Sequence, residues 1–188
     1  MKIAIYGGSF NPPHNAHLEI AKKSIELLSI DKVIFVPTNI SPHKIENENI
    51  VSGIQRLEML SLLIGLTKKI EISDYEIQNH GISYTIETLK YFSKIFPTDE
   101  LFLIIGEDNL TDLNSWKDIL EIKKLVKYIV VPRDNEELKN SSDCIILNIK
   151  PIDISSSKTR KYILEGKDTS KMIPSDVNDF IKKNKLYI

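Results

Sequence analysis

The 188-residue sequence has few of the residues from which disulfide frameworks and metal cages are built. Cys144 is its only cysteine, which excludes a disulfide within the chain and a zinc site made of cysteines. It also carries almost no net charge, because 25 basic side chains balance 26 acidic ones to leave −1 at pH 7. No overall field therefore draws it to nucleic acid or an anionic membrane. An anionic ligand would have to be held by local groups.

Long apolar runs are missing as well. No stretch approaches the ~20 residues that cross a bilayer, and Met1–Ile5 is too short for the apolar core of a signal peptide. We therefore expect a soluble, cytoplasmic protein with no membrane partner. Its length suits one domain over residues 1–188, with a C-terminal helical part, about 155–188, packed on the rest.

Apolar β-type runs alternate with amphipathic helical windows along the chain. The predicted strands are Lys2–Tyr6, Lys32–Val36, Lys69–Ser73, Leu101–Ile105, Lys127–Val131 and Cys144–Ile149. The predicted helices are Asn15–Leu28, Ser52–Leu66, Tyr84–Phe96, Ser155–Glu165 and Pro174–Lys183, with a loop and short helices around Trp116. This alternation predicts an α/β fold: a doubly wound, mostly parallel, Rossmann-like sheet with helices on both faces. Such a sheet binds its ligand beyond the carboxyl ends of its strands, at the point where the strand order reverses.

The segment after the first predicted strand, GGSFNPPHNAH over residues 7–17, has the composition of a phosphate site. Gly7 and Gly8 predict a sharp backbone turn and a close approach to a ligand. His14 and His17 stand three residues apart at a helix start, so both rings can lie on one side of its first turn. Free N–H groups there, with two imidazoles, favour phosphate. A simple turn with capping or packed histidines is the alternative, and neither GxxxxGK[ST] nor GxGxxG is matched.

A second candidate phosphate clamp opens the predicted helix near the C-terminus, where residues 154–160 read ISSSKTR. Serine is a favoured helix N-cap. The hydroxyls of Ser156 and Ser157 and the guanidinium of Arg160 could bind phosphate oxygens. A plain capped helix with solvated basic side chains explains the segment equally well. Two clamps at separate helix starts indicate a polyphosphate held across a crevice.

Together the two segments resemble the signatures of the nucleotidyltransferase superfamily with HxGH and ISSTxxR motifs, and in particular its bacterial nicotinate-nucleotide adenylyltransferases. Further segments carry the resemblance along the whole chain: Pro42-His43-Lys44, Gly81–Thr85, Ile105–Asp108, Trp116, Val131–Arg133 and Leu186-Tyr187. The chain departs from the usual pattern at four positions, with Ser9 for threonine, Asn11 for aspartate, Ala16 for glycine and Ser157 for threonine. Asn11 removes a charge, which would alter the handling of metal or phosphate slightly.

The resemblance implies an enzyme of NAD biosynthesis that joins ATP to nicotinate mononucleotide, giving deamido-NAD and pyrophosphate without a covalent enzyme intermediate. Mg²⁺ would be carried with ATP, with no metal site built by the protein. The catalytic residues implied are His14, His17, Lys44 and Arg160. Those implied for ATP are Gly7, Gly8, Ser9, Phe10, His17, Gly106, Asp108, Ser156, Ser157 and Arg160. Those implied for nicotinate mononucleotide are Lys44, Ser83, Tyr84, Thr85, Trp116 and Arg133.

Simpler roles exist for several of these residues. Asp108 could cap the next helix, Ser83 and Thr85 could cap another, and Trp116 could anchor the core rather than stack on a pyridine ring. At the level of function, the same chemistry on nicotinamide mononucleotide or phosphopantetheine is one alternative. A catalytically silent nucleotide-binding regulator is another, although the pair of histidines and Arg160 argues against it.

Overall fold

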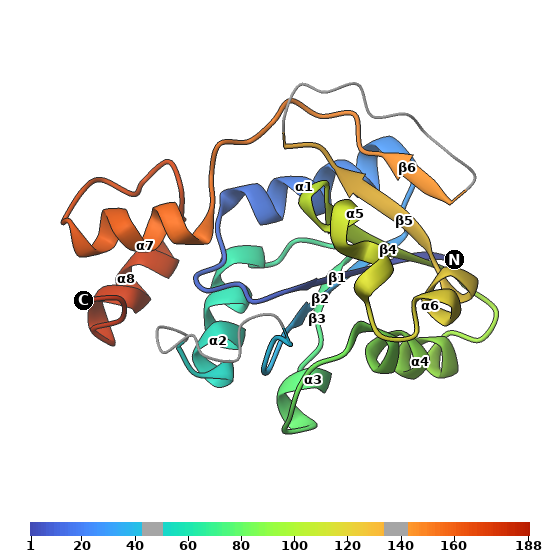
Figure 1. The fold of residues 1–188 in the computed structure, drawn as a ribbon. Coiled ribbons are helices and arrows are strands. Elements are labelled where there is room, and N and C mark those ends of the chain that lie inside the picture. The colour runs from blue at the N-terminus through green and yellow to red at the C-terminus, as the bar shows by residue number, and fades with distance from the viewer. Residues whose placement is uncertain (43–50, 134–142) are drawn as a thin grey trace.

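The centre of the fold is one parallel sheet, which Figure 1 shows in the computed structural model of the chain. The structure describes residues 1–42, 51–133 and 143–188. The strands are β1 (Lys2–Gly8), β2 (Lys32–Pro37), β3 (Ile70–Ile72), β4 (Glu100–Gly106), β5 (Lys127–Val131) and β6 (Cys144–Ile146). They lie in the order β3-β2-β1-β4-β5-β6, and each neighbouring pair is parallel. The predicted doubly wound α/β class is confirmed, and its switch point lies between β1 and β4.

The helices follow the sequence prediction closely in place and length. They are α1 (Asn15–Leu28), α2 (Gly53–Ile64), α3 (Tyr75–Gln78), α4 (Thr85–Ile95), α5 (Asp108–Asp112), α6 (Ile119–Leu125), α7 (Ser156–Leu164) and α8 (Ser175–Lys183), with a 3₁₀ turn at Leu113–Ser115. The four-residue α3 was not predicted, because one turn is too short to show a helical period. Among the described residues, none of these helices combines the length and the apolar character needed to cross a membrane.

Side chains of β1 alternate between two hydrophobic cores, one on each face of the sheet. Ala4 and Tyr6 belong to the first core, with residues of α1, α2 and α8. Ile3 and Ile5 belong to the second core, with residues of α4 and α6. Helices therefore cover both faces of the sheet, as the apolar character of the strands predicts.

The C-terminal helices form a unit beside the carboxyl end of the sheet. Figure 1 shows α7 and α8 together at one end of the molecule, with the C-terminus next to them. Val177 and Ile181 of α8 are fully buried in the first core. The chain reaches this unit after β6, which ends at Ile146 rather than at the predicted Ile149. The N–H of Ile149 donates to the carbonyl of Leu147, a local bond in place of one to the neighbouring strand.

Candidate active site

The loop that follows β1 turns at Phe10 and not at the glycines. Gly7 and Gly8 are the last residues of the strand, where they pair with Val36 and Pro37 of β2, so the sharp turn predicted there is wrong. Phe10 takes the left-handed conformation instead, with φ 46°. A Cβ on Gly8 would lie 3.0 Å from the Phe10 ring, while one on Gly7 would meet open space, and the close approach of the glycines to a ligand stays a prediction.

The two histidines of this segment form a stacked pair. Their ring centroids lie 3.6 Å apart with the planes inclined by 18°, as the three-residue spacing predicted. The backbone N–H of His14 donates to Nδ1 of His17 at 3.1 Å. Nδ1 of His17 is thus an acceptor, which places the proton of the neutral ring on Nε2. His17 therefore offers an N–H donor to a ligand.

Both imidazoles are neutral at pH 7. Burial, reinforced by the charge of Arg133, lowers the pKa of His14 to about 4. Burial and the neighbouring His14 hold the pKa of His17 well below its usual range, and Arg133 adds to the effect. The two neutral rings can therefore donate N–H hydrogen bonds to an anion without taking up a proton themselves.

The backbone N–H groups at the start of α1 are largely used inside the protein, which corrects the expectation that they are free. His14 donates to His17, Asn15 donates to the carbonyl of Met172 at 2.8 Å, and His17 donates to the carbonyl of His14 at 2.9 Å. The side chains are therefore the groups at this helix start that remain available to a ligand. Nδ1 of His14 is buried without a hydrogen-bond partner in the described structure, and a ligand would satisfy such a group.

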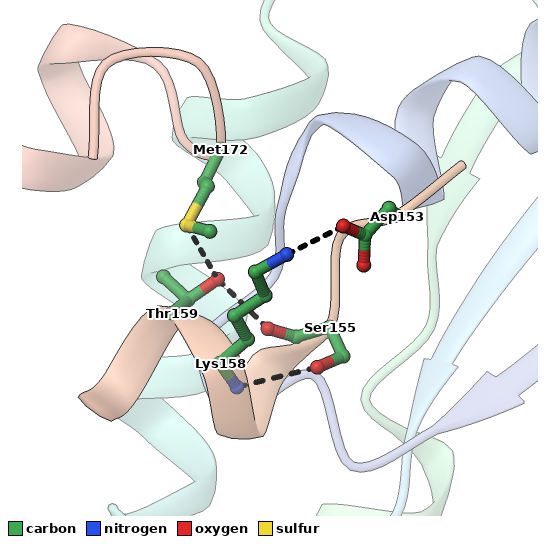
Figure 2. Close-up of polar contacts among 5 residues, drawn as sticks. All are labelled: Asp153, Ser155, Lys158, Thr159 and Met172. Carbon is green, nitrogen blue, oxygen red and sulfur yellow. Dashed lines mark hydrogen bonds and ion pairs between the residues drawn. The ribbon is translucent and has the colours of Figure 1, made fainter. Parts of the chain in front are cut away.

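The start of α7 is held by the contacts in Figure 2. Ser155 is the N-cap, and its hydroxyl accepts from the N–H of Lys158 at 3.2 Å. Thr159 donates to the carbonyl of Ser155 at 2.9 Å, and the same hydroxyl lies 3.7 Å from the sulfur of Met172. The amine of Lys158 pairs with Asp153 at 2.6 Å. The predicted serine cap is thus present, and it fixes the position of the residues that follow.

Those residues join the second motif to the first loop. The Ser156 hydroxyl donates to the carbonyl of Pro12 at 2.9 Å. Arg160 donates to the carbonyl of Asn11 at 2.7 Å and to the hydroxyl of Ser157 at 3.3 Å. Two segments about 150 positions apart in sequence therefore meet at one place, as a shared polyphosphate site requires.

A third group of predicted residues lies at the ends of β4 and β5. The N-cap of α5 is Glu107, so the capping role considered for Asp108 is wrong. The carboxylate of Asp108 instead lies 3.3 Å from the guanidinium of Arg133. A Cβ on Gly106 would come within 2.4 Å of a carboxylate oxygen of Asp108, so a larger residue would displace that side chain. Arg133 thus pairs with Asp108, a residue that the resemblance assigns to ATP. The assignment of Arg133 to nicotinate mononucleotide stays a prediction.

The residues predicted for the acceptor lie at the start of α4 and before α6. The amine of Lys117 sits over the Tyr84 ring, 4.3 Å from its centroid. Tyr84 and Trp116 both pack, partly buried, against the second core, so Trp116 does help to anchor the core while keeping exposed surface. The Ser83 hydroxyl accepts from the N–H of Asn39 at 3.0 Å, an internal contact that fixes the segment. Thr85 opens α4 and is half-buried.

Two other residues hold the first loop and were missed or left without a role by the sequence analysis. Arg56 is 1% exposed, and it donates to the carbonyls of Ser9 at 2.8 Å and Val51 at 3.1 Å. The sequence signal was a lone basic residue in a mostly apolar helix. The second is Tyr187, which in the sequence served only as part of the family resemblance.

The predicted catalytic residue Lys44 lies outside the described residues. Within the described ranges, no group of three His, Cys, Asp or Glu side chains could hold a metal ion.

A parallel sheet with neutral imidazoles and guanidinium groups at its switch point defines a nucleotide-binding protein built to handle phosphates. The model of the cytidylyltransferase-like family matches residues 5–162. A protein of Clostridium acetobutylicum named "probable nicotinate-nucleotide adenylyltransferase" is 44% identical, over 100% of this chain and 99% of its own. A protein of Borreliella burgdorferi with the same name is 42% identical, over 100% of this chain and 97% of its own.

A solved structure agrees with these relatives. Nicotinic acid mononucleotide adenylyltransferase of Plasmodium falciparum, complexed with NaAD, superimposes with a TM-score of 0.84 at 25% identity, covering 99% of this chain and 97% of that one. The chain belongs to the cytidylyltransferase-like family, among its nicotinate-nucleotide adenylyltransferases.

Proposed function

We propose that residues 1–188 act as one nucleotidyltransferase domain that moves the adenylyl group of ATP to nicotinate mononucleotide. The observation that carries this proposal is the junction of the two motif segments, where one short loop bears the stacked histidines and accepts hydrogen bonds from Ser156 and Arg160. Relatives that match the full length and are named for this activity support the same acceptor.

The reaction is a single in-line displacement. An oxygen of the acceptor phosphate attacks the α-phosphorus of ATP and forms a new P–O bond. The bond from that phosphorus to the bridging oxygen breaks, and pyrophosphate leaves with the oxygen and its electron pair. The attacking phosphate, with a second pKa of about 6, is mostly ionised at pH 7. No general base and no covalent intermediate is needed, so catalysis rests on positioning and on stabilising charge.

The histidine pair suits this task because its rings are neutral donors. His17 donates through Nε2 to the α-phosphate, where charge develops in the transition state, and His14 binds a neighbouring phosphate oxygen. Arg160 and the hydroxyl of Ser157 hold the β- and γ-phosphates, while Ser156, whose hydroxyl donates to the carbonyl of Pro12, fixes the loop beside them. Lys44, by resemblance, adds positive charge to the same groups. Mg²⁺ enters as part of the substrate, bound mainly by the oxygens of ATP and by water.

The two nucleotides lie on either side of this centre. Gly7, whose Cβ position is open, and Gly106 leave room for ATP, and Asp108 accepts a hydrogen bond from its ribose. On the acceptor side, Trp116 stacks on the pyridine ring and Tyr84 lines the same edge of the second core.

The test is the release of pyrophosphate from Mg²⁺ and ATP, with each acceptor offered separately and a blank without acceptor. We expect strong preference for nicotinate mononucleotide over nicotinamide mononucleotide and phosphopantetheine. Release with only another acceptor would keep the chemistry and refute this acceptor. No release with any of the three, together with retained ATP binding, would refute the enzyme and favour a nucleotide-binding regulator.

A further inference from the structure

The turn at the centre of the site is strained. Phe10 has φ 46°, a region that is sterically unfavourable for a bulky L-residue. Such a conformation persists only where the surroundings hold it. Polar contacts hold it on both sides. Before it, the buried guanidinium of Arg56 donates to the carbonyl of Ser9 at 2.8 Å; after it comes Asn11.

Asn11 is the point where distant parts of the chain meet. The residue is 3% exposed, and its side-chain oxygen accepts from the hydroxyl of Tyr187 at 2.7 Å and from the N–H of Val51 at 3.3 Å. Its backbone carbonyl accepts from Arg160. All these donors use oxygen acceptors, which an aspartate would also offer, so the contacts do not explain the departure from aspartate at this position.

The donor from the C-terminus is well anchored. Leu186 is buried in the first core, and its N–H donates to the carbonyl of Ile181 at 3.0 Å, which ties the tail to α8. Tyr187 packs against the same core, and burial raises the pKa of its phenol. The hydroxyl is therefore a neutral, protonated donor across the working pH range.

The strained turn determines where the Phe10 ring lies. The ring packs edge-on against His17, with centroids 4.9 Å apart and planes inclined by 80°, and it also contacts Phe35 at 5.3 Å. We propose that Tyr187 is a positioning residue for the ATP site: its hydroxyl, through Asn11, holds the Phe10 turn and so orients His17. The inference rests on the proposed function, because it assigns His17 to the α-phosphate.

The first experiment is Tyr187→Phe, which keeps the ring and removes only the hydroxyl. Loss of one neutral hydrogen bond lowers the population of the competent loop, so we expect the Kd of a non-hydrolysable ATP analogue to rise about fivefold. We expect kcat to fall with it and KM for nicotinate mononucleotide to stay unchanged. Tyr162→Phe is the matched control, because Tyr162 is a partly buried tyrosine of α7 whose ring contacts Lys167, and it should change none of these values.

A double-mutant cycle tests the route through Asn11. In an Asn11→Ala background, Tyr187→Phe should add nothing, since the acceptor of its hydroxyl is already gone. An unchanged Kd with only a lower Tm would overturn the proposal, as would an equal rise in KM for both substrates or full additivity in the cycle. Binding of the ATP analogue needs no acceptor. If the wild type binds the analogue but uses no nicotinate mononucleotide, the proposed function fails while this inference is still tested.

Discussion

Lowering the pH from 7 to 5 is expected to destabilise the protein through His14. Burial, reinforced by the charge of Arg133, lowers the pKa of His14 to about 4 in the folded protein, against about 6.5 in the unfolded chain. Between these values the unfolded chain binds a proton that the folded protein does not. The free energy of unfolding therefore falls as the pH falls. The contribution of neutral His14 is fully present above about pH 6.5 and is lost progressively toward pH 4.

The size of the effect follows from the two pKa values. Integrating the difference in bound protons from pH 7 to pH 5 gives a loss of about 2 kcal/mol for His14. His17 adds to the loss, because its pKa is lowered as well. Glu76 acts in the opposite direction, since burial raises the pKa of its carboxyl and favours folding at lower pH. A comparison with a variant is therefore needed.

The assay is urea unfolding at pH 7, 6 and 5 for the wild type and for His14→Asn. Asparagine is a good N-cap residue, so the start of α1 should remain formed. Titrating groups other than His17 contribute alike to both proteins, and His17 enlarges the difference because its pKa is lowered less when His14 is absent. We expect the wild type to lose about 2 kcal/mol more than the variant between pH 7 and pH 5. Equal losses, within about 0.5 kcal/mol of each other given the error of extrapolation, would refute the assignment of a neutral His14.

Further changes test other parts of the site. His17→Ala should lower kcat by about 100-fold or more while the Kd of an ATP analogue rises no more than about tenfold; equal losses would contradict its role in the transition state. Gly106→Ala should weaken binding of the analogue about tenfold by calorimetry, because the Cβ of the alanine would come within 2.4 Å of Asp108 and displace it. Unchanged affinity would show that Asp108 does not contact ATP. Thr159→Val should cost about 1 kcal/mol in urea unfolding by removing the donor to the Ser155 carbonyl, and a variant as stable as the wild type would refute that contribution.

Much of the fold was predictable because it depends on local patterns. The helix Asn15–Leu28 and the strand Lys127–Val131 were predicted with the bounds that the structure has. Alternation of strands and helices implied parallel strands and placed the ligand at their carboxyl ends. The stacking of His14 on His17 also follows from local geometry, because residues three apart at a helix start share one side.

Details of backbone and hydrogen bonding were not predictable from residue type. Glycine permits a turn without requiring one, so Gly7 and Gly8 remain in β1 while Phe10 makes the turn. The N–H of Asn15 is used because the Met172 carbonyl lies opposite. That contact brings together residues more than 150 positions apart, and no pattern in the sequence indicates it.

The sequence by itself determined the class of fold, the two phosphate-binding segments and the resemblance that names the reaction, since these depend on periodicity and on residue types at short spacing. Only the tertiary structure decided that Tyr187 and Arg160 both bind Asn11, and that Arg133 pairs with Asp108. It also decided the protonation state of the histidines. A pKa depends on which groups exclude water from a side chain and which charges approach it, and those neighbours come from every part of the folded chain.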